Sequence, residues 1–346
     1  MPAMLPLRLL GLLLVAFAGF LATACASTPP AARIDAPQPL FTTTPYESWR
    51  ILGARPTFEL RDADGQPTLV GRGPIPSNGF LASPREFGDF TLTVEVRLGS
   101  ADNPKGDKMN SGIQIRSQER DGTVAGLQIE VDPTKRAWSG GVYDERGRAW
   151  LANLEDNEAG RAAFRLGEWN RYEIECDGPR IRTRVNGVPC AEWYDGIVSG
   201  LLAFQVHGGP PCEVAFRAPM IVERGRHAWT PMADEPGASS GERVAWAHSV
   251  DARTRGVRVE VEGSGHVEVT AADGTRLCDV SFAAADAKSP AARRLEVVWL
   301  EGAGAVLLDG RRVGVLQCTG APARVRVLGE SCTARTPERL AEQPRM

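Results

Sequence analysis

The sequence predicts an all-β protein, made of one antiparallel sandwich followed by a second, smaller β-rich domain. Over residues 46–224 short runs of alternating apolar and polar residues are separated by Gly, Pro, Asn and Asp, a pattern typical of antiparallel strands in a sandwich. Helical periodicity is scarce, and only residues 151–164 suggest a short helix. A length of 346 residues favours two domains and allows a sizeable core.

The first 24 residues predict a bacterial export signal. Arg8 precedes an apolar run over residues 9–21, and the sequence LATAC then ends at Cys25. This run is shorter than the about 20 residues that a membrane-spanning helix needs. LATAC resembles a lipobox, the motif whose cysteine receives diacylglycerol before cleavage, although Ala22 stands where a larger aliphatic residue is more usual. We therefore expect lipidation at Cys25, with a plain secretory signal as the alternative.

Residues 25–45 predict an extended tether that begins at the lipidated cysteine. They are rich in Pro, Ala and Thr and offer little that a core could bury. Ala26 follows the cysteine in place of Asp, which by resemblance to Gram-negative lipoproteins favours sorting to the outer membrane. We expect a protein of the cell envelope that its lipid holds on the outer membrane, facing the periplasm.

Composition and motif content exclude several classes of function. The formal net charge is -3 and no long basic run occurs, so nucleic acid is not an expected partner. No Gly-rich phosphate loop, GxSxG elbow, HExxH pair or EF-hand loop is present, so no pattern signals a metal site or a cofactor. The seven cysteines contain no CxxC pair, and we expect most of them to be buried free thiols.

Residues 169–195, WNRYEIECDGPRIRTRVNGVPCAEWYD, predict the clearest hairpin of the first domain. Alternating apolar residues share one face, the sequence DGP reverses the chain, and Asn186 with Gly187 predicts the next turn. We expect this asparagine and glycine to serve the turn rather than any chemistry.

The strand pattern breaks at residues 225–243, which are rich in Pro, Gly, Ser and acidic residues. We interpret this segment as a linker between the domain at residues 46–224 and a second β-rich domain at residues 244–333. In the second domain, residues 293–316 repeat the pattern of the earlier hairpin, which predicts a small lectin-like sandwich. Residues 334–346 look like a loose tail.

Polar residues share one face of the strand expected around LQIEVD. Gln128, Glu130 and Asp132 point to one side, and the three apolar residues between them point to the other. An acid within an apolar strand must face solvent or be paired, which makes Glu130 a candidate acid or base. For Asp132 a second interpretation stays open, because the following proline also suits the start of a turn.

Neighbouring strands should bring further polar side chains to the same concave face. These are Gln114, Arg116, Gln205 and His207, each of which alternates with apolar residues. Arg116 is a candidate to hold a substrate oxygen, or else a structural partner of a nearby acid. His207 is a candidate acid, base or metal ligand, and the alternative is a ring that caps a loop.

Aromatic residues flank the sequence SGGVYDE. Trp138 and Trp150 offer faces for stacking on a sugar ring, with packing in the core as the alternative. Tyr143 is a candidate donor to a substrate oxygen. Asp144 and Glu145 are equally compatible with the solvated edge of a loop.

Taken together and in order, a set of short motifs resembles the bacterial 3-keto-disaccharide hydrolase family. The motifs are NGFLAS, FGDFTLTVEVR, MNSGIQIRS, GLQIEVDP, AWSGGVYDE, GEWNRYEIECDGPRIRTRVNG, LAFQVHGG and VAFRAPMI. The resemblance covers residues 46–223, and it implies a concanavalin A-like jelly roll and activity on glycosides oxidised at C3 of the sugar. Jelly-roll relatives often bind calcium, so the resemblance leaves room for a divalent cation. Many relatives carry Glu then Gln where this chain has Gln128 then Glu130.

The chemistry of such a substrate can be stated from its structure. A ketone at C3 makes the C2 hydrogen acidic, so a base can remove it, the C1 substituent can leave, and water can add back. This route needs a base near C2, a donor at the ketone oxygen and an acid for the leaving oxygen. Ordinary glycosidases instead place two carboxylates at C1.

The sequence therefore predicts a lipid-anchored enzyme that cleaves 3-keto-glycosides or disaccharides. In this hypothesis Glu130 or Asp132 is the base or acid, His207 supports them, and the remaining polar residues bind substrate: Gln114, Arg116, Gln128, Trp138, Tyr143 and Gln205. The first alternative is a non-catalytic carbohydrate-binding lipoprotein, because this fold hosts lectins as readily as hydrolases. The second alternative is a structural module of the envelope.

Overall fold

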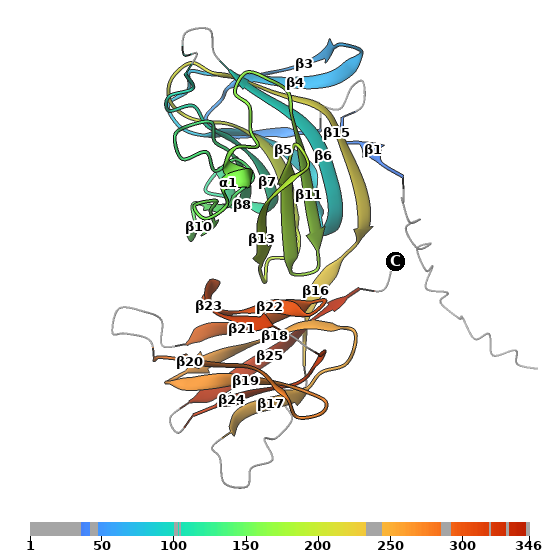
Figure 1. The fold of residues 1–346 in the computed structure, drawn as a ribbon, viewed down its shortest axis with the longest axis vertical. Coiled ribbons are helices and arrows are strands. Elements are labelled where there is room, and N and C mark those ends of the chain that lie inside the picture. Colours follow the sequence, from blue (N-terminus) through green and yellow to red (C-terminus); the bar gives the residue numbers. More distant parts are fainter. Residues whose placement is uncertain are drawn as a thin grey trace, which may run out of the picture. The chain divides into compact units, whose positions relative to one another are not determined.

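The computed structural model describes residues 36–41, 48–99, 103, 105–232, 244–284, 292–317, 320–329 and 332–343. These residues form antiparallel strands and a single four-residue helix, α1 (Glu158–Arg161), so the predicted all-β class is confirmed (Figure 1). None of the described helices has the length and apolar character needed to span a bilayer. The expected export signal and the lipidation site at Cys25 lie outside the described residues.

The chain up to β15 forms a sandwich of two antiparallel sheets, the predicted jelly roll (Figure 1). The first, here called the β6 sheet, has the order β13 (Val188–Tyr194), β12 (Arg180–Val185), β11 (Asn170–Asp177), β6 (Asp89–Gly99), β15 (Glu213–Gly225), β4 (Gln66–Arg72) and β3 (Thr57–Ala63), with β1 (Gln38–Pro39) paired to β15. The second, the β8 sheet, has the order β10 (Ala149–Ala152), β9 (Val142–Glu145), β8 (Thr123–Val131), β7 (Ser111–Arg120), β14 (Gly200–Val206), β5 (Gly79–Phe87) and β2 (Arg50–Gly53).

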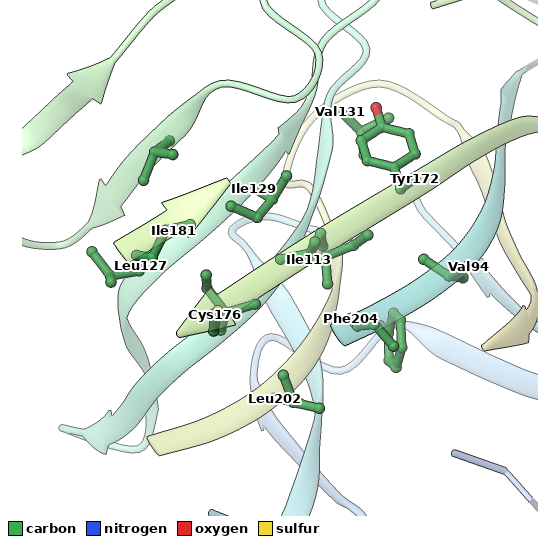
Figure 2. Close-up of a cluster of buried hydrophobic side chains, with 14 of the residues drawn as sticks. Val94, Ile113, Leu127, Ile129, Val131, Tyr172, Cys176, Ile181, Leu202 and Phe204 are labelled. Atoms are coloured by element: carbon green, nitrogen blue, oxygen red, sulfur yellow. The ribbon is translucent and has the colours of Figure 1, made fainter. Parts of the chain in front are cut away.

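The core lies between these two sheets and contains the alternate side chains of each strand. In β8, Leu127, Ile129 and Val131 are fully buried, and Figure 2 shows them among side chains from other strands, including Tyr172 and Phe204. Each such apolar side chain stabilises the fold by about 1.5–3 kcal/mol on burial. Because these three residues point inward, the residues between them must point to the opposite face of the β8 sheet.

The sandwich begins earlier in the chain than expected. Gln38 and Pro39 pair with β15, and Phe41 packs against Trp49 and Phe204 in the core with 2% of its surface exposed. The prediction of an extended tether over residues 25–45 is therefore wrong for residues 38–41. Composition missed this contact because one aromatic residue and one short edge pairing do not change the overall polar character of the segment.

The second β-rich region also contains two sheets. One has the order β16 (His227–Pro231), β25 (Thr333–Glu342), β18 (Thr254–Glu262), β21 (Arg293–Leu300), β22 (Ala303–Leu308) and β23 (Arg311–Gln317). The other has the order β17 (Val244–Ser249), β24 (Pro322–Leu328), β19 (Gly265–Ala271) and β20 (Arg276–Phe282). A separate apolar cluster, which includes Trp246, Val259 and Val327, joins them.

Two segments expected to be irregular are strands of this region. His227–Pro231, inside the predicted linker, pairs with Thr333–Glu342, which was expected to be a loose tail. Residues 233–243, the rest of that linker, lie outside the described residues. The tail prediction is wrong because β25 has few apolar residues; its backbone pairs with both neighbouring strands, and Glu338 forms an ion pair with Arg258 of β18.

The turns and the cysteine side chains agree with what the sequence predicts. Asn186 and Gly187 have φ angles of 51° and 79°, as a two-residue hairpin turn requires, and Asp309 with Gly310 repeats this conformation. Four of the described cysteines are free and buried, as expected: Cys176, Cys190, Cys212 and Cys332. Cys278 is also buried.

Candidate functional site

A row of amide side chains lies on the face of the β8 sheet that points away from the core. Gln114 of β7 and Gln205 of β14 each donate from Nε2 to Oε1 of Gln128, at 2.6 and 2.9 Å. Gln128 in turn donates from Nε2 to Oε2 of Glu130 at 2.7 Å. Three strands thus bring four of the predicted residues together, and the row ends on the Glu130 carboxylate.

Three residues of this row, Gln128, Glu130 and Gln205, line a cavity of about 280 Å³. That volume is near the lower end of the range for small-molecule sites, about 300–1,000 Å³. The lining residues are Asn78, Asn110, Gln128, Glu130, Arg136, Tyr143, Glu145, Trp150, Gln205 and His207. The cavity therefore contains carboxyl, guanidinium, imidazole, phenol, indole and amide groups.

Glu130 is the most deeply buried acid of the cavity, with 3% of its surface exposed. Burial raises its pKa to about 7, although two hydrogen bonds favour the ionised form: Asn110 donates to Oε1 and Gln128 to Oε2. The Nη2 atom of Arg136 lies 3.9 Å from Oε1. A carboxyl group with this pKa can take up and release a proton at neutral pH, as a general base must.

Asp132 does not face the cavity, so the prediction that it shares the open face with Glu130 is wrong. Strand β8 ends at Val131, and the Asp132 side chain turns into the following loop. Its Oδ1 accepts hydrogen bonds from the backbone and hydroxyl of Thr134, and its Oδ2 accepts one from Nε of Arg136 at 2.9 Å. The turn interpretation of this residue is confirmed, and its effect on the cavity is to hold Arg136 in place.

Arg116 also lies away from the cavity, on the core side of the sheet. A β-bulge interrupts the pairing of β7 with β8 between Ile115 and Gln118, and Arg116 has a φ of 46°, so the alternation expected from the sequence is broken there. The guanidinium is 2% exposed; it pairs with Asp89 at 3.2 Å and donates to the carbonyl oxygen of Gly178 at 2.7 Å. The expected substrate-binding role is therefore wrong, and the structural one is correct, with a different acid as partner.

Gln114 is also buried and does not line the cavity. It accepts a hydrogen bond from the hydroxyl of Ser117 at 2.9 Å and donates to Gln128. Its effect on the site is to fix the orientation of the Gln128 amide.

Some of the aromatic residues line the cavity, and another packs behind them. Trp150 lines the cavity and meets Trp138 and Tyr143 edge to face, with ring centroids 4.7 and 5.2 Å apart. Trp138 is not a lining residue, so its contribution is packing behind Trp150. The guanidinium of Arg136 lies 5.2 Å from the Trp150 ring. Burial raises the pKa of Tyr143, which therefore keeps its proton as a hydrogen-bond donor.

Asn78 connects the two remaining titratable groups of the cavity. Its Oδ1 accepts from the backbone N–H of Gly208, next to His207, and its Nδ2 donates to Oε1 of Glu145 at 3.1 Å. Burial lowers the pKa of His207 and raises the pKa of Glu145. Glu145 therefore belongs to the cavity wall rather than to a solvated loop edge.

Sequence reasoning missed Asn78, Asn110 and Arg136 as lining residues. The two asparagines stand just before strands β5 and β7, within NGFLAS and MNSGIQIRS, where their side chains reach over the sheet edge. Arg136 follows Asp132 by four residues, a spacing typical of an ion pair across a turn. Position next to a strand end was the only signal for these residues.

A larger hollow, of about 460 Å³, lies over strands β11 to β13 of the β6 sheet. Its charged groups neutralise one another, as Arg182 does with Glu175 at 3.0 Å. It has no aromatic ring and no histidine among its lining residues, so the smaller cavity is the better candidate site. In the described part of the chain no cluster of three or more His, Cys, Asp or Glu residues has the geometry to hold a metal ion.

A family model described as a 3-keto-alpha-glucoside-1,2-lyase-like domain matches residues 36–222, more than half of the chain. The chain belongs to this family. The matched residues correspond to the jelly roll from β1 to β15, which contains every lining residue of the cavity. The 3-keto-alpha-glucoside-1,2-lyase-like domain is thus the part of the protein that carries the candidate site.

Solved structures resemble this domain at low sequence identity. A carbohydrate-binding module, CBM66, from Bacillus subtilis has 14% identity and a TM-score of 0.40, over 51% of this chain and 96% of that one. A putative glycosyl hydrolase from Parabacteroides distasonis has 16% identity and a TM-score of 0.38, over 55% of this chain and all of that one. A galectin-like protein from Bacillus subtilis has 14% identity and a TM-score of 0.39, over 55% of this chain and 96% of that one. No curated protein matches the sequence.

Family membership makes this a carbohydrate-related protein. The family model covers only the jelly roll, so it assigns no role to the second β-rich region.

Proposed function

We propose that this protein cleaves 3-keto-glycosides by removing the C2 proton, with Glu130 as the base. The observation that carries the proposal is the state of Glu130: a buried carboxyl group at a cavity wall, held by amide donors at both oxygens, with a pKa of about 7. A sugar with a C3 ketone has an acidified C2 hydrogen, so a carboxylate of this strength suffices.

In the proposed reaction Glu130 takes the C2 proton, and the electron pair of that C–H bond forms an enolate with the C3 carbonyl. The enolate then expels the C1 substituent, and water adds across C1 and C2 to give the free 3-keto sugar. Arg136 is the one guanidinium among the described lining residues, and its positive charge stabilises the enolate oxygen. Tyr143 and the neutral His207 donate hydrogen bonds to other sugar oxygens.

The assay is release of 4-nitrophenol from 4-nitrophenyl 3-keto-α-glucoside by the wild type and by Glu130→Gln. We expect the variant to lose about 10²- to 10⁴-fold in kcat/KM, the usual contribution of a general base. The matched control is Glu119→Gln, which changes an exposed carboxylate of β7 that pairs with Arg50 and does not line the cavity. Equal rates for the wild type and Glu130→Gln would remove Glu130 from its role.

A carbohydrate-binding function is the second candidate, and one observation favours it. Trp150 lines the cavity beside Trp138 and Arg136, and aromatic rings next to hydrogen-bonding groups are typical of sugar sites. Binding of 3-keto-glucosides without release of the leaving group by the wild type would support this function instead of catalysis.

We also propose that the protein is anchored in the outer membrane through a lipid on Cys25. The motif LATAC and the residue after the cysteine support this proposal. Mass spectrometry of the N-terminal peptide from bacterial membranes should find a diacylglycerol-modified Cys25. Cys25→Ser should shift the protein out of the membrane fraction, and an unmodified peptide would contradict the anchor.

A further inference from the structure

The cavity holds two carboxyl groups whose hydrogen bonding differs. Both oxygens of Glu130 accept hydrogen bonds from amide groups, an arrangement that suits an ionised carboxylate. In Glu145 only Oε1 accepts one, from Asn78, and no hydrogen bond to Oε2 is present among the described residues. The two acids of this cavity thus differ in which carboxyl oxygens stay open to a ligand.

The orientation of Asn78 decides which oxygen of Glu145 can carry a proton. The backbone N–H of Gly208 can only donate, so the Asn78 atom that faces it at 3.0 Å must be the carbonyl oxygen. The amide nitrogen of Asn78 therefore faces Glu145 and donates to Oε1. A proton on Glu145 consequently sits on Oε2, where no described residue accepts it and a ligand can.

The strand register places the two acids at opposite ends of the cavity. The backbone of Glu130 pairs with Gly141 of the neighbouring segment, whereas Glu145 of β9 lies opposite Gly126 of β8. Their Cα atoms are thus separated by four residues along the strand and one strand across, or about 14 Å. Both side chains line the same cavity, so one bound ligand can contact both carboxyl groups.

We propose that Glu145 is the proton donor to the leaving oxygen. This inference rests on the reaction proposed above, in which Glu130 is the base. When the C1–O1 bond breaks, its electron pair stays on O1, and O1 takes the proton from Oε2 of Glu145. In the hydration step the Glu145 carboxylate accepts a proton from water as the hydroxyl adds to C1, and Glu130 returns its proton to C2. Both residues are then restored.

The other proton carriers of the cavity are less suited to this step. Burial lowers the pKa of His207, so its ring is neutral at neutral pH and is a weak proton donor. Burial raises the pKa of Tyr143 above its usual value of 10, which makes the phenol a poor acid. Glu145, whose pKa burial raises from the ordinary value of 4.5, holds its proton over a wider pH range than an exposed glutamate does.

The experiment compares two leaving groups in the same enzyme samples. Wild type and Glu145→Gln are assayed on two substrates. Methyl 3-keto-α-glucoside has a methoxide leaving group, which needs a proton in order to depart. 4-Nitrophenyl 3-keto-α-glucoside has a nitrophenolate leaving group, which departs without one. We expect kcat/KM of the variant to fall about 10²- to 10⁴-fold on the methyl glycoside and less than about tenfold on the nitrophenyl glycoside. The ratio of the two losses is independent of the folded fraction, and Glu119→Gln should leave both rates unchanged.

Equal losses on both substrates would overturn the acid role and leave the proposed function standing, because the wild type would still cleave them. No release from either substrate by the wild type would overturn the proposed function and the acid role together. Cleavage of the unoxidised glucosides with the same dependence on leaving group would keep Glu145 as an acid but replace C2 proton removal by ordinary glycoside hydrolysis.

Discussion

Replacing Glu130 with glutamine should change how the stability of the protein depends on pH. The ordinary pKa of a glutamate is 4.5, and burial raises that of Glu130 to about 7. At about 1.4 kcal/mol per pKa unit, this interval corresponds to about 3 kcal/mol of unfolding free energy. Below pH 4.5 the group is protonated in the folded and unfolded states alike, so its stabilising contribution is complete there.

As the pH rises from 4.5 to about 7, the unfolded chain releases this proton while the folded protein retains it. The wild type therefore loses about 3 kcal/mol of stability from Glu130 over that window and loses no more above it. The glutamine of Glu130→Gln cannot lose a proton. The unfolding free energy of the variant should therefore rise relative to that of the wild type by about 3 kcal/mol between pH 4.5 and about 7. Any misfit of the new amide against Asn110 and Gln128 is independent of pH and only offsets the curve.

The measurement is urea unfolding of both proteins at intervals from pH 4.5 to 8.5. Glu119→Gln, which removes an exposed ion pair with Arg50, is the control and should give a difference curve that stays within about 1 kcal/mol. In the activity assay, kcat/KM of the wild type should rise with pH along a limb centred near 7. A difference in unfolding free energy between the wild type and Glu130→Gln that does not change with pH would refute the reasoning. Glu130 would then be solvated, and its pKa would not lie near neutral pH as the proposed base requires.

Three further outcomes follow from the same contacts. Arg116→Met should destabilise the protein by about 3–5 kcal/mol, because the buried Asp89 carboxylate loses its arginine and keeps only its contacts with His227 and the Gly178 N–H. Thermal unfolding tests this, and a change within about 1 kcal/mol would contradict the structural role. Asp132→Asn should lower kcat more than it raises KM, since Arg136 loses the charge that holds it in position to stabilise the enolate oxygen, and an unchanged kcat would count against that link. In Glu145→Gln, chemical denaturation should show wild-type stability or better near pH 8, because a half-buried ionised carboxyl group is gone. A loss above about 2 kcal/mol would contradict this.

Much of the fold was predictable because the alternation of apolar and polar residues in each strand of a sandwich reflects which of its faces is buried. Leu127, Ile129 and Val131 are fully buried, as their alternation with polar residues predicts, and Asn186 with Gly187 adopts the turn expected from these two residue types. The strand β25 was missed because backbone pairing with β16 and β18 holds it, and backbone pairing leaves no trace in residue type.

The candidate site was predictable where alternation continues without interruption. Gln128 and Glu130 lie on the face that the two-residue alternation of a strand predicts, and Gln205 of β14 lies on the same face. Arg116 departs from this rule because a β-bulge turns its side chain to the opposite face. A single extra residue in a strand reverses every face that follows it, and none of the three residues on either side of Arg116 is a glycine that would indicate the bulge.

The sequence by itself determined the all-β class, the polar face around Glu130 and the family, because these depend on local periodicity and on short ordered motifs. Only the tertiary structure decided that Asn78, Asn110 and Arg136 complete the cavity and that Glu145 lines it together with Glu130. These residues come from four separate segments. Their meeting point, and the burial that raises the pKa of Glu130 to about 7, exist only when the strands and loops of the β8 sheet are assembled.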